Sequence, residues 1–343
     1  MQPMSSLMLK AESGRPRLTS ATTTDAAPEQ RDPRANGRAI APGDIGFVGL
    51  GRMGMAMAKN LADGGRRVIA CVRRPQQMGA LLALGLTPTT DLSDLFDCEV
   101  VISMLPDDEA VREVALGRQE RKGLAAGLRP GAIHLSMSTI STAAASQLAS
   151  AHARCGQGYV AAPVFGNPDA AKARQLFVVA AGAPADVERC RPLLDQLGQG
   201  TFVVGNDAAH ANLIKLMGNM LTATALEMLG ETVALIRKRG LDPGRFVEVM
   251  TRTMFGGRVH RIYGERIVAQ DYAAGFALPL VLKDVRLALA EAESAGVPMP
   301  SVSVVRDRLM TGIARGYAEL DWTALGLIAA EEAGAPAARS PAP

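Results

Sequence analysis

Three glycines at fixed spacing constrain this chain more than any other feature. Gly49, Gly51 and Gly54 spell G-x-G-x-x-G between an apolar run at 45–50 and an amphipathic stretch at 53–63. The run predicts a buried strand, and the stretch predicts a helix. At such a turn the first glycine permits a sharp bend, the second leaves room for a pyrophosphate, and the third lets the helix pack closely. Because the helix N-terminus then faces the phosphates with unpaired N–H groups, the sequence predicts a dinucleotide site rather than an ordinary strand-to-helix turn.

Short apolar runs alternate with helical stretches from residue 44 to residue 206. After the first strand, further strands are expected at 67–72, 99–105, 132–138, 159–164, 175–182 and 201–205. Helices are expected between them at 53–63, at 75–84, from about 107, and at 142–153. This alternation predicts an α/β fold, with a Rossmann doubly wound parallel sheet as the dinucleotide-binding domain.

The pattern changes after residue 206, where only helical stretches follow. Residues 208–239 form one unbroken helical pattern without proline, and shorter helices are expected at 243–253, 279–295 and 302–315. A helix of the first length would span about 48 Å, which exceeds the width of a small domain. We therefore expect an all-α domain for substrate binding and dimerisation at 207–332, joined to the sheet by a long helix.

The two ends of the chain differ from its middle. Residues 1–43 mix Ser, Thr, Pro, Ala and charges without a period, which predicts a disordered N-terminal extension. A flexible tail is expected at 333–343.

Composition excludes several classes of partner. The 37 basic and 34 acidic residues are scattered, and aromatic residues make up 4% of the chain, so we expect no nucleic-acid partner. No apolar run reaches the roughly 18 residues of a membrane span, so we expect no membrane partner. The four cysteines and four histidines show no metal-ligand spacing, which predicts no metal site. Without a Cys-x-x-Cys pair, a reducing cytoplasmic location is favoured.

The end of the second strand bears on the choice of cofactor. An NAD site places an acid there for the ribose 2′-hydroxyl, but residues 64–90 contain no Asp or Glu. The strand ends instead in Arg73 and Arg74, whose guanidinium groups suit a 2′-phosphate. The sequence therefore favours NADP (NADPH) over NAD, although one of these arginines could be a solvated loop charge.

Five motifs, in order, carry a resemblance to a known family. They are GFVGLGRMGMAMAKNL at 46–61, VISMLPDDEAV at 101–111, SMSTIS at 136–141, NLIKLMGNML at 212–221 and VLKDVRLAL at 281–289. On these motifs the chain resembles the β-hydroxyacid dehydrogenases, which are 3-hydroxyisobutyrate dehydrogenase-like and related to 6-phosphogluconate dehydrogenase, over roughly residues 44–330. The resemblance implies an NAD(P)-dependent dehydrogenase or reductase acting on CH–OH groups.

The resemblance also implies where the cofactor and substrate bind. It places cofactor contacts at Gly49, Leu50, Gly51, Arg52, Met53, Gly54, Leu105, Pro106, Thr139 and Lys283. It places Ser138 beside the nicotinamide, where its hydroxyl would help Asn219 to position the substrate.

The motif at 212–221 resembles the catalytic helix of the family, with Lys215 and Asn219 at its two functional positions. The residues are four apart, so they lie on one face of a helix. Lys215 is flanked by apolar residues, which is unusual for a solvated lysine. As general acid/base, Lys215 would protonate a carbonyl oxygen during reduction and take the proton back during oxidation. Burial must lower its pKa for the second role, and Asn219 could orient the substrate oxygen.

The substrate loop departs from the family pattern. The family commonly has Asp-Ala-Pro-Val-Ser-Gly-Gly there, and its Ser-Gly-Gly holds the substrate carboxylate. Here Phe165 replaces the serine, Gly166 is kept, and Asn167 replaces the last glycine. The ring adds bulk and removes a hydroxyl, so a bulkier or less polar carbonyl, or an imine, becomes more plausible than a small hydroxy acid.

Three functions remain open from the sequence. The leading one is hydride transfer between a nicotinamide cofactor and a small carbonyl or 3-hydroxy acid. An imine reductase of the same fold is favoured by Phe165 and disfavoured by Lys215, because such enzymes usually carry Asp or Tyr at that position. A non-catalytic NADP-binding reader module is also disfavoured by Lys215. The long helix and the resemblance predict a homodimer or a dimer-based tetramer.

Overall fold

The computed structural model describes residues 43–335. The predicted extension at 1–43 and tail at 333–343 lie outside this range, apart from their innermost residues. The first part of the described chain alternates strands and helices, as the sequence predicts. Its elements are β1 (Ile45–Val48), α1 (Arg52–Asp63), β2 (Val68–Cys71), α2 (Met78–Ala83), β3 (Thr87–Thr89), β4 (Val100–Ser103), α3 (Asp108–Leu116), β5 (Gly117–Arg118), β6 (Arg121–Lys122), α4 (Leu124–Gly127), β7 (Ile133–Ser136), α5 (Thr142–Arg154), β8 (Gly158–Ala161), β9 (Val164–Phe165), α6 (Pro168–Lys172), β10 (Leu176–Ala181), α7 (Pro184–Leu197) and β11 (Gly198–Gly205).

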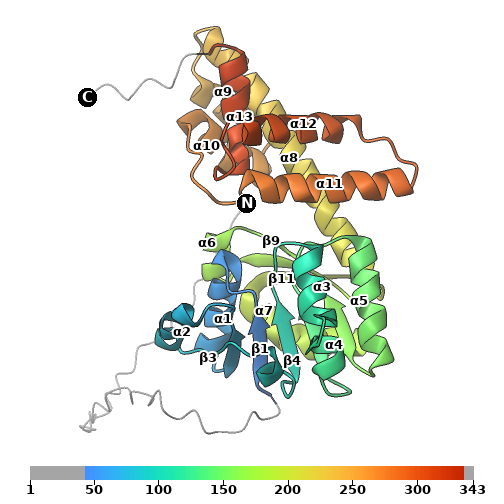
Figure 1. Cartoon of the computed structure of the whole chain (residues 1–343). Helices are drawn as coiled ribbons and strands as arrows, with labels where there is room; N and C mark the ends of the chain where they lie inside the picture. The colour runs from blue at the N-terminus through green and yellow to red at the C-terminus, as the bar shows by residue number, and fades with distance from the viewer. Residues whose placement is uncertain (1–42, 336–343) are drawn as a thin grey trace, which may run out of the picture. The chain divides into compact units, whose positions relative to one another are not determined.

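The main sheet has the strand order β11-β10-β8-β7-β4-β1-β2-β3, with β9 paired to β10 (Figure 1). β1 lies parallel between β2 and β4, and its Phe47 is opposite Ala70 and Ile102. From β1 the chain continues to β2 and β3 on one side of the sheet, and it then crosses to β4 on the other side of β1. The strand order therefore reverses between β1 and β4. In open α/β sheets a ligand crevice forms outside the carboxyl ends of the strands at such a switch point.

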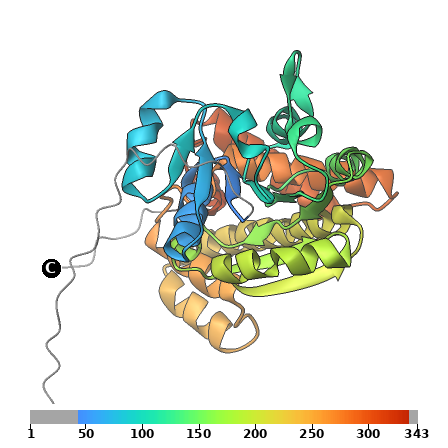
Figure 2. The same ribbon diagram turned by 90° about the horizontal axis from the view of Figure 1, so that it is seen from below.

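Helices cover both faces of this sheet, which confirms the predicted Rossmann-type fold class. On one face Met57 of α1 and Leu194 of α7 pack in the core, and on the other Val111 of α3 and Leu148 of α5 do so. β5 and β6 form a hairpin that projects from this part of the chain (Figure 2).

The sheet departs from the expected all-parallel arrangement at one end. β10 runs antiparallel to β8 and β9, and β11 then pairs parallel with β10. The single strand expected at 159–164 is divided into β8 and β9. Between β8 and β10 the chain forms only β9 and the five-residue helix α6. A parallel pair of strands usually requires a crossover helix, and this connection contains no long helix. β10 therefore runs in the opposite direction to β8.

The second part of the described chain is helical. Its elements are α8 (Ala208–Lys238), α9 (Pro243–Arg252), α10 (Arg258–Ala269), α11 (Leu278–Ser294), α12 (Pro300–Ala314) and α13 (Leu325–Glu332). The 31 residues of α8 run from the sheet into this helical part (Figure 1). The Asp207 side chain caps the start of α8 by accepting a hydrogen bond from the Ala209 N–H at 2.9 Å. The long helix predicted from 208 is therefore confirmed.

The sequence pattern predicts no helix at α10 or α13. Charged residues and Gly264 interrupt the apolar period of α10. This glycine lies against α9, where a Cβ would come within 2.9 Å of Val247 Cγ1. Tertiary packing therefore stabilises a helix that the local sequence pattern does not predict.

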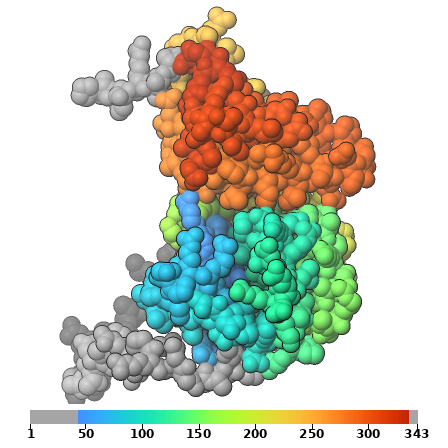
Figure 3. All heavy atoms as spheres, in the orientation of Figure 1, coloured from blue at the N-terminus to red at the C-terminus, as the bar shows by residue number. Residues whose placement is uncertain are grey.

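The helical part packs on the sheet part through α11. The Lys283 ammonium donates to the Thr139 carbonyl, and the Thr142 hydroxyl donates to the Glu291 carboxylate. Figure 3 shows the helices in orange meeting the green part of the sheet domain. Between residues 43 and 335, no helix has the length and apolar character needed to span a membrane.

Candidate active site

A cleft of about 2040 Å³ lies at the carboxyl ends of β1, β2 and β4. It is lined by the glycine turn, the loop after β4, the loop after β9, and α8 around Lys215. The segment before α11 completes the wall. The cleft thus occupies the position at which this fold binds ligands.

The glycine turn has the shape that a pyrophosphate needs. Gly49 has φ +95°, and a Cβ there would lie 2.2 Å from the Met104 carbonyl oxygen. A Cβ on Gly54 would lie 1.9 Å from the Gly49 carbonyl oxygen. Gly51, at the N-cap of α1, instead faces open space, and a Cβ added there would meet nothing within 4 Å. Two glycines therefore build the turn, and the third leaves room in front of the helix N-terminus, which fits the phosphates of a dinucleotide.

Arg52, Met53 and Leu50 line the cleft beside these glycines. The Arg52 Nη1 donates to the Ala274 carbonyl oxygen at 2.5 Å, across 222 positions of sequence. The turn that fits the phosphates is therefore tied directly to the segment before α11.

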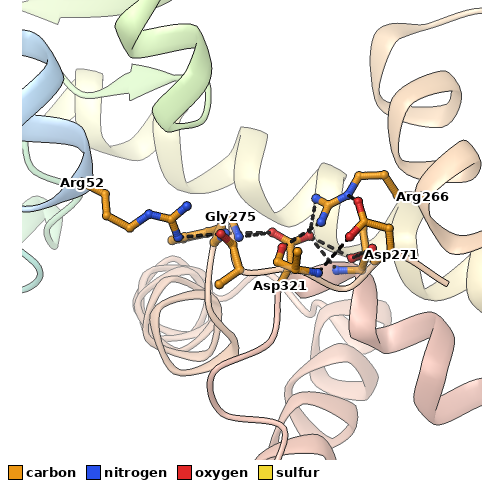
Figure 4. A network of polar contacts seen from close by, with 9 residues as sticks. Arg52, Arg266, Asp271, Gly275 and Asp321 are labelled. Carbon is orange, nitrogen blue, oxygen red and sulfur yellow. Dashed lines mark hydrogen bonds and ion pairs between the residues drawn. The ribbon is translucent and has the colours of Figure 1, made fainter. Parts of the chain in front are cut away.

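That segment is held in place by buried Asp321 (Figure 4). The Asp321 carboxylate accepts hydrogen bonds from the Gly275 N–H at 3.2 Å and the Phe276 N–H at 2.8 Å. The Arg266 guanidinium pairs with Asp321 at 3.0 Å and with Asp271 at 3.0 Å. Arg52 thus contacts a segment whose backbone is fixed by charge-assisted hydrogen bonds.

Arg73 and Arg74 follow β2, are exposed, and line the cleft. Both are therefore accessible to a ligand at the end of the cleft formed by β2. Asp91 also lines this end of the cleft, outside the 64–90 window. The Ser93 N–H donates to its carboxylate and lowers the pKa of Asp91.

The loop after β4 carries Leu105 and Pro106, which both line the cleft. The Leu105 N–H donates to the Ser138 Oγ at 2.8 Å. Ser138 is fully buried and is not among the cleft-lining residues, whereas its neighbour Thr139 is. The structure therefore places the Ser138 hydroxyl where it holds the Leu105 loop, and its contact with substrate stays a prediction.

Lys215 and Asn219 lie in the cleft wall as parts of a buried hydrogen-bonded relay. The Lys215 Nζ donates to the Asn219 Oδ1 at 2.8 Å, and the Asn219 Nδ2 donates to the Asp284 Oδ2 at 2.6 Å. The Asp284 Oδ1 pairs with the Lys283 Nζ at 2.8 Å, and Lys283 reaches the Thr139 carbonyl. The relay connects α8, α11 and the nicotinamide-side segment that the sequence predicts.

Burial dominates the acid–base behaviour of Lys215. The residue is 8% exposed, and desolvation lowers its pKa from 10.5 to about 8. The Asp284 carboxylate opposes this shift, and the Lys283 ammonium adds to it. An amine with such a pKa can both donate and accept a proton near neutral pH, as the predicted role requires.

β9 and the loop after it bring the three predicted substrate residues to the cleft. The Phe165 ring lies 4.4 Å from the Lys215 Nζ, measured to the ring centroid. Gly166 has φ +141°, and a Cβ there would lie 2.6 Å from Leu176 Cδ2. The Asn167 side chain caps α6 by accepting from the Ala170 N–H at 2.9 Å. Asn167 therefore lines the cleft with its side-chain oxygen already engaged.

Two histidines lie in the core outside the cleft. The Gln157 amide nitrogen donates to the Ala125 and Leu128 carbonyls, so its oxygen accepts from the His152 Nδ1–H at 2.6 Å. In a neutral His152 ring the Nε2 then accepts from the His134 Nδ1–H at 2.9 Å. The His134 Nε2 accepts in turn from the Ser103 hydroxyl at 2.8 Å. Burial lowers the pKa of both histidines, which favours neutral rings, and with neutral rings every hydrogen in this chain of bonds is assigned.

The described residues hold no group of three or more His, Cys, Asp or Glu side chains that could bind a metal ion.

Sequence reasoning missed three residues of this site. Asp284 follows Lys283 in a recognised motif, but only the fold brings it to Asn219. Nothing in the sequence indicates that Gly218 lies against the Phe165 ring. Arg258 lines the cleft from the start of α10, a helix that the pattern does not predict.

Two family models match the chain in succession. Residues 44–205 match the one described as the NAD binding domain of 6-phosphogluconate dehydrogenase. Residues 209–328 match the one described as NAD-binding of NADP-dependent 3-hydroxyisobutyrate dehydrogenase. Together they span both parts of the fold.

Two relatives and one solved structure match this chain over nearly their whole length. An uncharacterized oxidoreductase of Bacillus subtilis, YfjR, is 37% identical over 82% of this chain and 98% of its own. The 3-hydroxyisobutyrate dehydrogenase of Pseudomonas aeruginosa is 32% identical over 77% of this chain and 90% of its own. A solved structure of Mycobacterium tuberculosis 3-hydroxyisobutyrate dehydrogenase with L-serine has a TM-score of 0.75 at 25% identity, covering 84% of this chain and 99% of that one.

Proposed function

The chain belongs to the β-hydroxyacid dehydrogenase family of NAD(P)-dependent oxidoreductases, and we propose that Lys215 is its general acid/base. The proposed reaction is hydride transfer between a nicotinamide cofactor and a small carbonyl compound or 3-hydroxy acid. The observation that carries this proposal is the buried relay from Lys215 through Asn219 to Asp284, which lies in the wall of the cleft that also holds the glycine turn.

The relay supplies what proton transfer needs. The bound nicotinamide would supply or accept the hydride. During reduction the Lys215 ammonium would donate a proton to the developing alkoxide oxygen, and during oxidation the neutral amine would take the hydroxyl proton. Asn219 holds the Lys215 Nζ through its carbonyl oxygen and is itself oriented by Asp284. Asp284 and Asn219 thereby fix the direction in which the amine approaches the substrate.

For the cofactor, we propose NADP rather than NAD. Arg73 and Arg74 are exposed at the end of β2, where the 2′-phosphate of NADP would lie. The description of the second matching family model, which names an NADP-dependent enzyme, also favours this choice. Asp91 is the competing group, because an acid near the ribose favours NAD.

The assembly we propose is a homodimer or a dimer-based tetramer. One stripe of α8 carries large apolar side chains seven residues apart, which are Ile214, Leu221, Met228 and Leu235, with exposed fractions of 42%, 76%, 62% and 57%. A second copy of the chain would cover this stripe, because residues seven apart recur on one face of a helix. The cytoplasmic location stays a prediction.

An imine reductase is the second candidate. The apolar Phe165 ring beside Lys215 favours a substrate without a carboxylate at that point. Lys215 argues against this candidate, because imine reductases of this fold usually carry Asp or Tyr at that position. A non-catalytic NADP-binding reader module is the third possibility, and Lys215 would have no function in it.

The direct test is NADPH or NADH oxidation at 340 nm with a panel of semialdehydes, keto acids and cyclic imines. The proposal expects turnover of at least one carbonyl compound, with NADPH used in preference to NADH. Turnover of imines alone would move the chain to the imine reductases. Tight NADPH binding without any turnover would contradict the proposed enzyme.

A further inference from the structure

The Phe165 ring and Gly218 fit together in the wall of the cleft. A Cβ on Gly218 would lie 2.4 Å from the Phe165 Cζ and 2.6 Å from its Cε1. The ring therefore occupies the space that any side chain at position 218 would need. Gly218 lies three residues after Lys215 on α8, so the notch and the amine share one face of the helix.

We infer that the Phe165 ring, seated in the notch at Gly218, shields the Lys215 amine from water and selects substrates with an uncharged, apolar group beside the reacting carbonyl. This inference rests on the proposed function, since it concerns the same amine and the same substrate.

The shielding follows from the groups that face Lys215. The ring covers the amine at 4.4 Å from β9, Asn219 contacts it from α8, and Asp284 and Lys283 act on it from α11. A ring face attracts an ammonium, which by itself would raise the pKa of Lys215. The pKa is nevertheless lowered to about 8, with burial as the largest cause. Burial of the amine, to which the ring at 4.4 Å contributes, is therefore the largest cause of the lowered pKa.

The selection follows from what the loop offers a substrate. Position 165 has no hydroxyl that could donate a hydrogen bond to a substrate carboxylate. Phe177 of β10 is opposite Phe165 in the register of β9 and β10, and both residues line the cleft. The two residues make this part of the wall apolar, and a carboxylate placed against the two rings would lose hydration there without a hydrogen-bond donor from either ring.

Two variants remove the ring from the amine by different routes. Phe165→Ser deletes the ring, and Gly218→Ala displaces it because the added methyl needs the same space. Phe165→Leu is the matched control, since it keeps an apolar side chain of smaller size. Agreement between the first two variants separates the role of the ring from any local effect of one substitution.

The first readout is independent of turnover. The chain contains seven lysines, so a protein labelled with ¹³C at lysine Cε gives few signals, and Lys215→Arg identifies the one from Lys215. We expect the pKa of Lys215 to rise by about one unit or more in Phe165→Ser and in Gly218→Ala, and by less in Phe165→Leu. An unchanged pKa in both variants would overturn the shielding.

The second readout is specificity. It compares kcat/KM for an aldehyde bearing an alkyl substituent with kcat/KM for its carboxylate-bearing analogue. In Phe165→Ser we expect the ratio to shift about tenfold or more toward the carboxylate, as one lost apolar contact and one gained hydroxyl donor imply. An unchanged ratio would overturn the selection. If the pKa moves as expected but no carbonyl compound reacts with the wild-type protein, the proposed function fails while the shielding stands.

Discussion

The three glycines of the turn have different tasks, and single alanine substitutions should separate them. At Gly54 an added Cβ would lie 1.9 Å from the Gly49 carbonyl oxygen, which is more than 1 Å inside ordinary contact. That oxygen belongs to the backbone and cannot rotate away, so α1 must shift on β1. Overpacking of this kind costs about 1–3 kcal/mol or more.

Gly51→Ala is the matched control for that cost. Gly51 has φ −75° and ψ −166°, which alanine adopts freely, and its Cβ would meet nothing within 4 Å. We expect the free energy of unfolding of Gly51→Ala to stay within about 1 kcal/mol of the wild-type value. The loss of a favourable N-cap residue lowers it, and the reduced entropy of the unfolded chain raises it. The methyl group would, however, occupy the space in front of the helix N-terminus that the phosphates need.

The assay measures thermal unfolding without cofactor and NADPH binding by calorimetry. Gly54→Ala should lower Tm by about 2–5 °C, since the average entropy of unfolding per residue makes 1 kcal/mol correspond to roughly 1.5 °C in a chain of this length. Gly51→Ala should keep its Tm within about 1.5 °C and lose at least about tenfold in NADPH affinity. Normal NADPH binding by Gly51→Ala, or an equal loss of Tm in both variants, would refute the division of tasks.

Other parts of the molecule lead to three further predictions. Burial lowers the pKa of both His134 and His152, so the unfolded chain binds more protons below about pH 6.5, and stability should fall as the pH drops. Between pH 7 and pH 5, urea unfolding should show that the free energy of unfolding falls by up to about 1.4 kcal/mol per histidine and pH unit. The fall should be smaller in His152→Gln, and an unfolding midpoint that does not depend on pH would contradict this prediction. Arg74→Glu should raise the KM for NADPH about tenfold or more while leaving that for NADH within about threefold, and equal effects on both would argue against a 2′-phosphate contact. Leu221→Lys on the exposed stripe of α8 should shift the protein toward monomer in analytical ultracentrifugation, whereas an unchanged sedimentation coefficient would place the interface elsewhere.

Local signals predicted the parts of this molecule that depend on neighbours in sequence. The glycine turn, the strand before it and the 31-residue α8 all show in short stretches of pattern, and the structure confirms them. Lys215 and Asn219 could be paired because a helix places residues four apart on one face.

The remaining features depend on contacts between distant segments. Asp284 is 65 positions from Asn219, and Phe165 is 53 positions from Gly218, so no spacing rule links them. The burial of Ser138 behind the Leu105 loop could not be inferred from a segment that reads as a strand end. β10 runs antiparallel to β8 because the connection through α6 contains no long crossover helix, and the periodicity of apolar residues does not indicate this.

The central claim is that Lys215 moves the proton of the substrate oxygen. Its most direct test compares kcat at pH 7 for wild type and Lys215→Met, with a carbonyl substrate found in the panel and with NADPH affinity measured in parallel. The account predicts a loss of about 10²- to 10⁴-fold in kcat with NADPH affinity unchanged within about threefold. Equal turnover by the two proteins, with cofactor bound equally well, would contradict it.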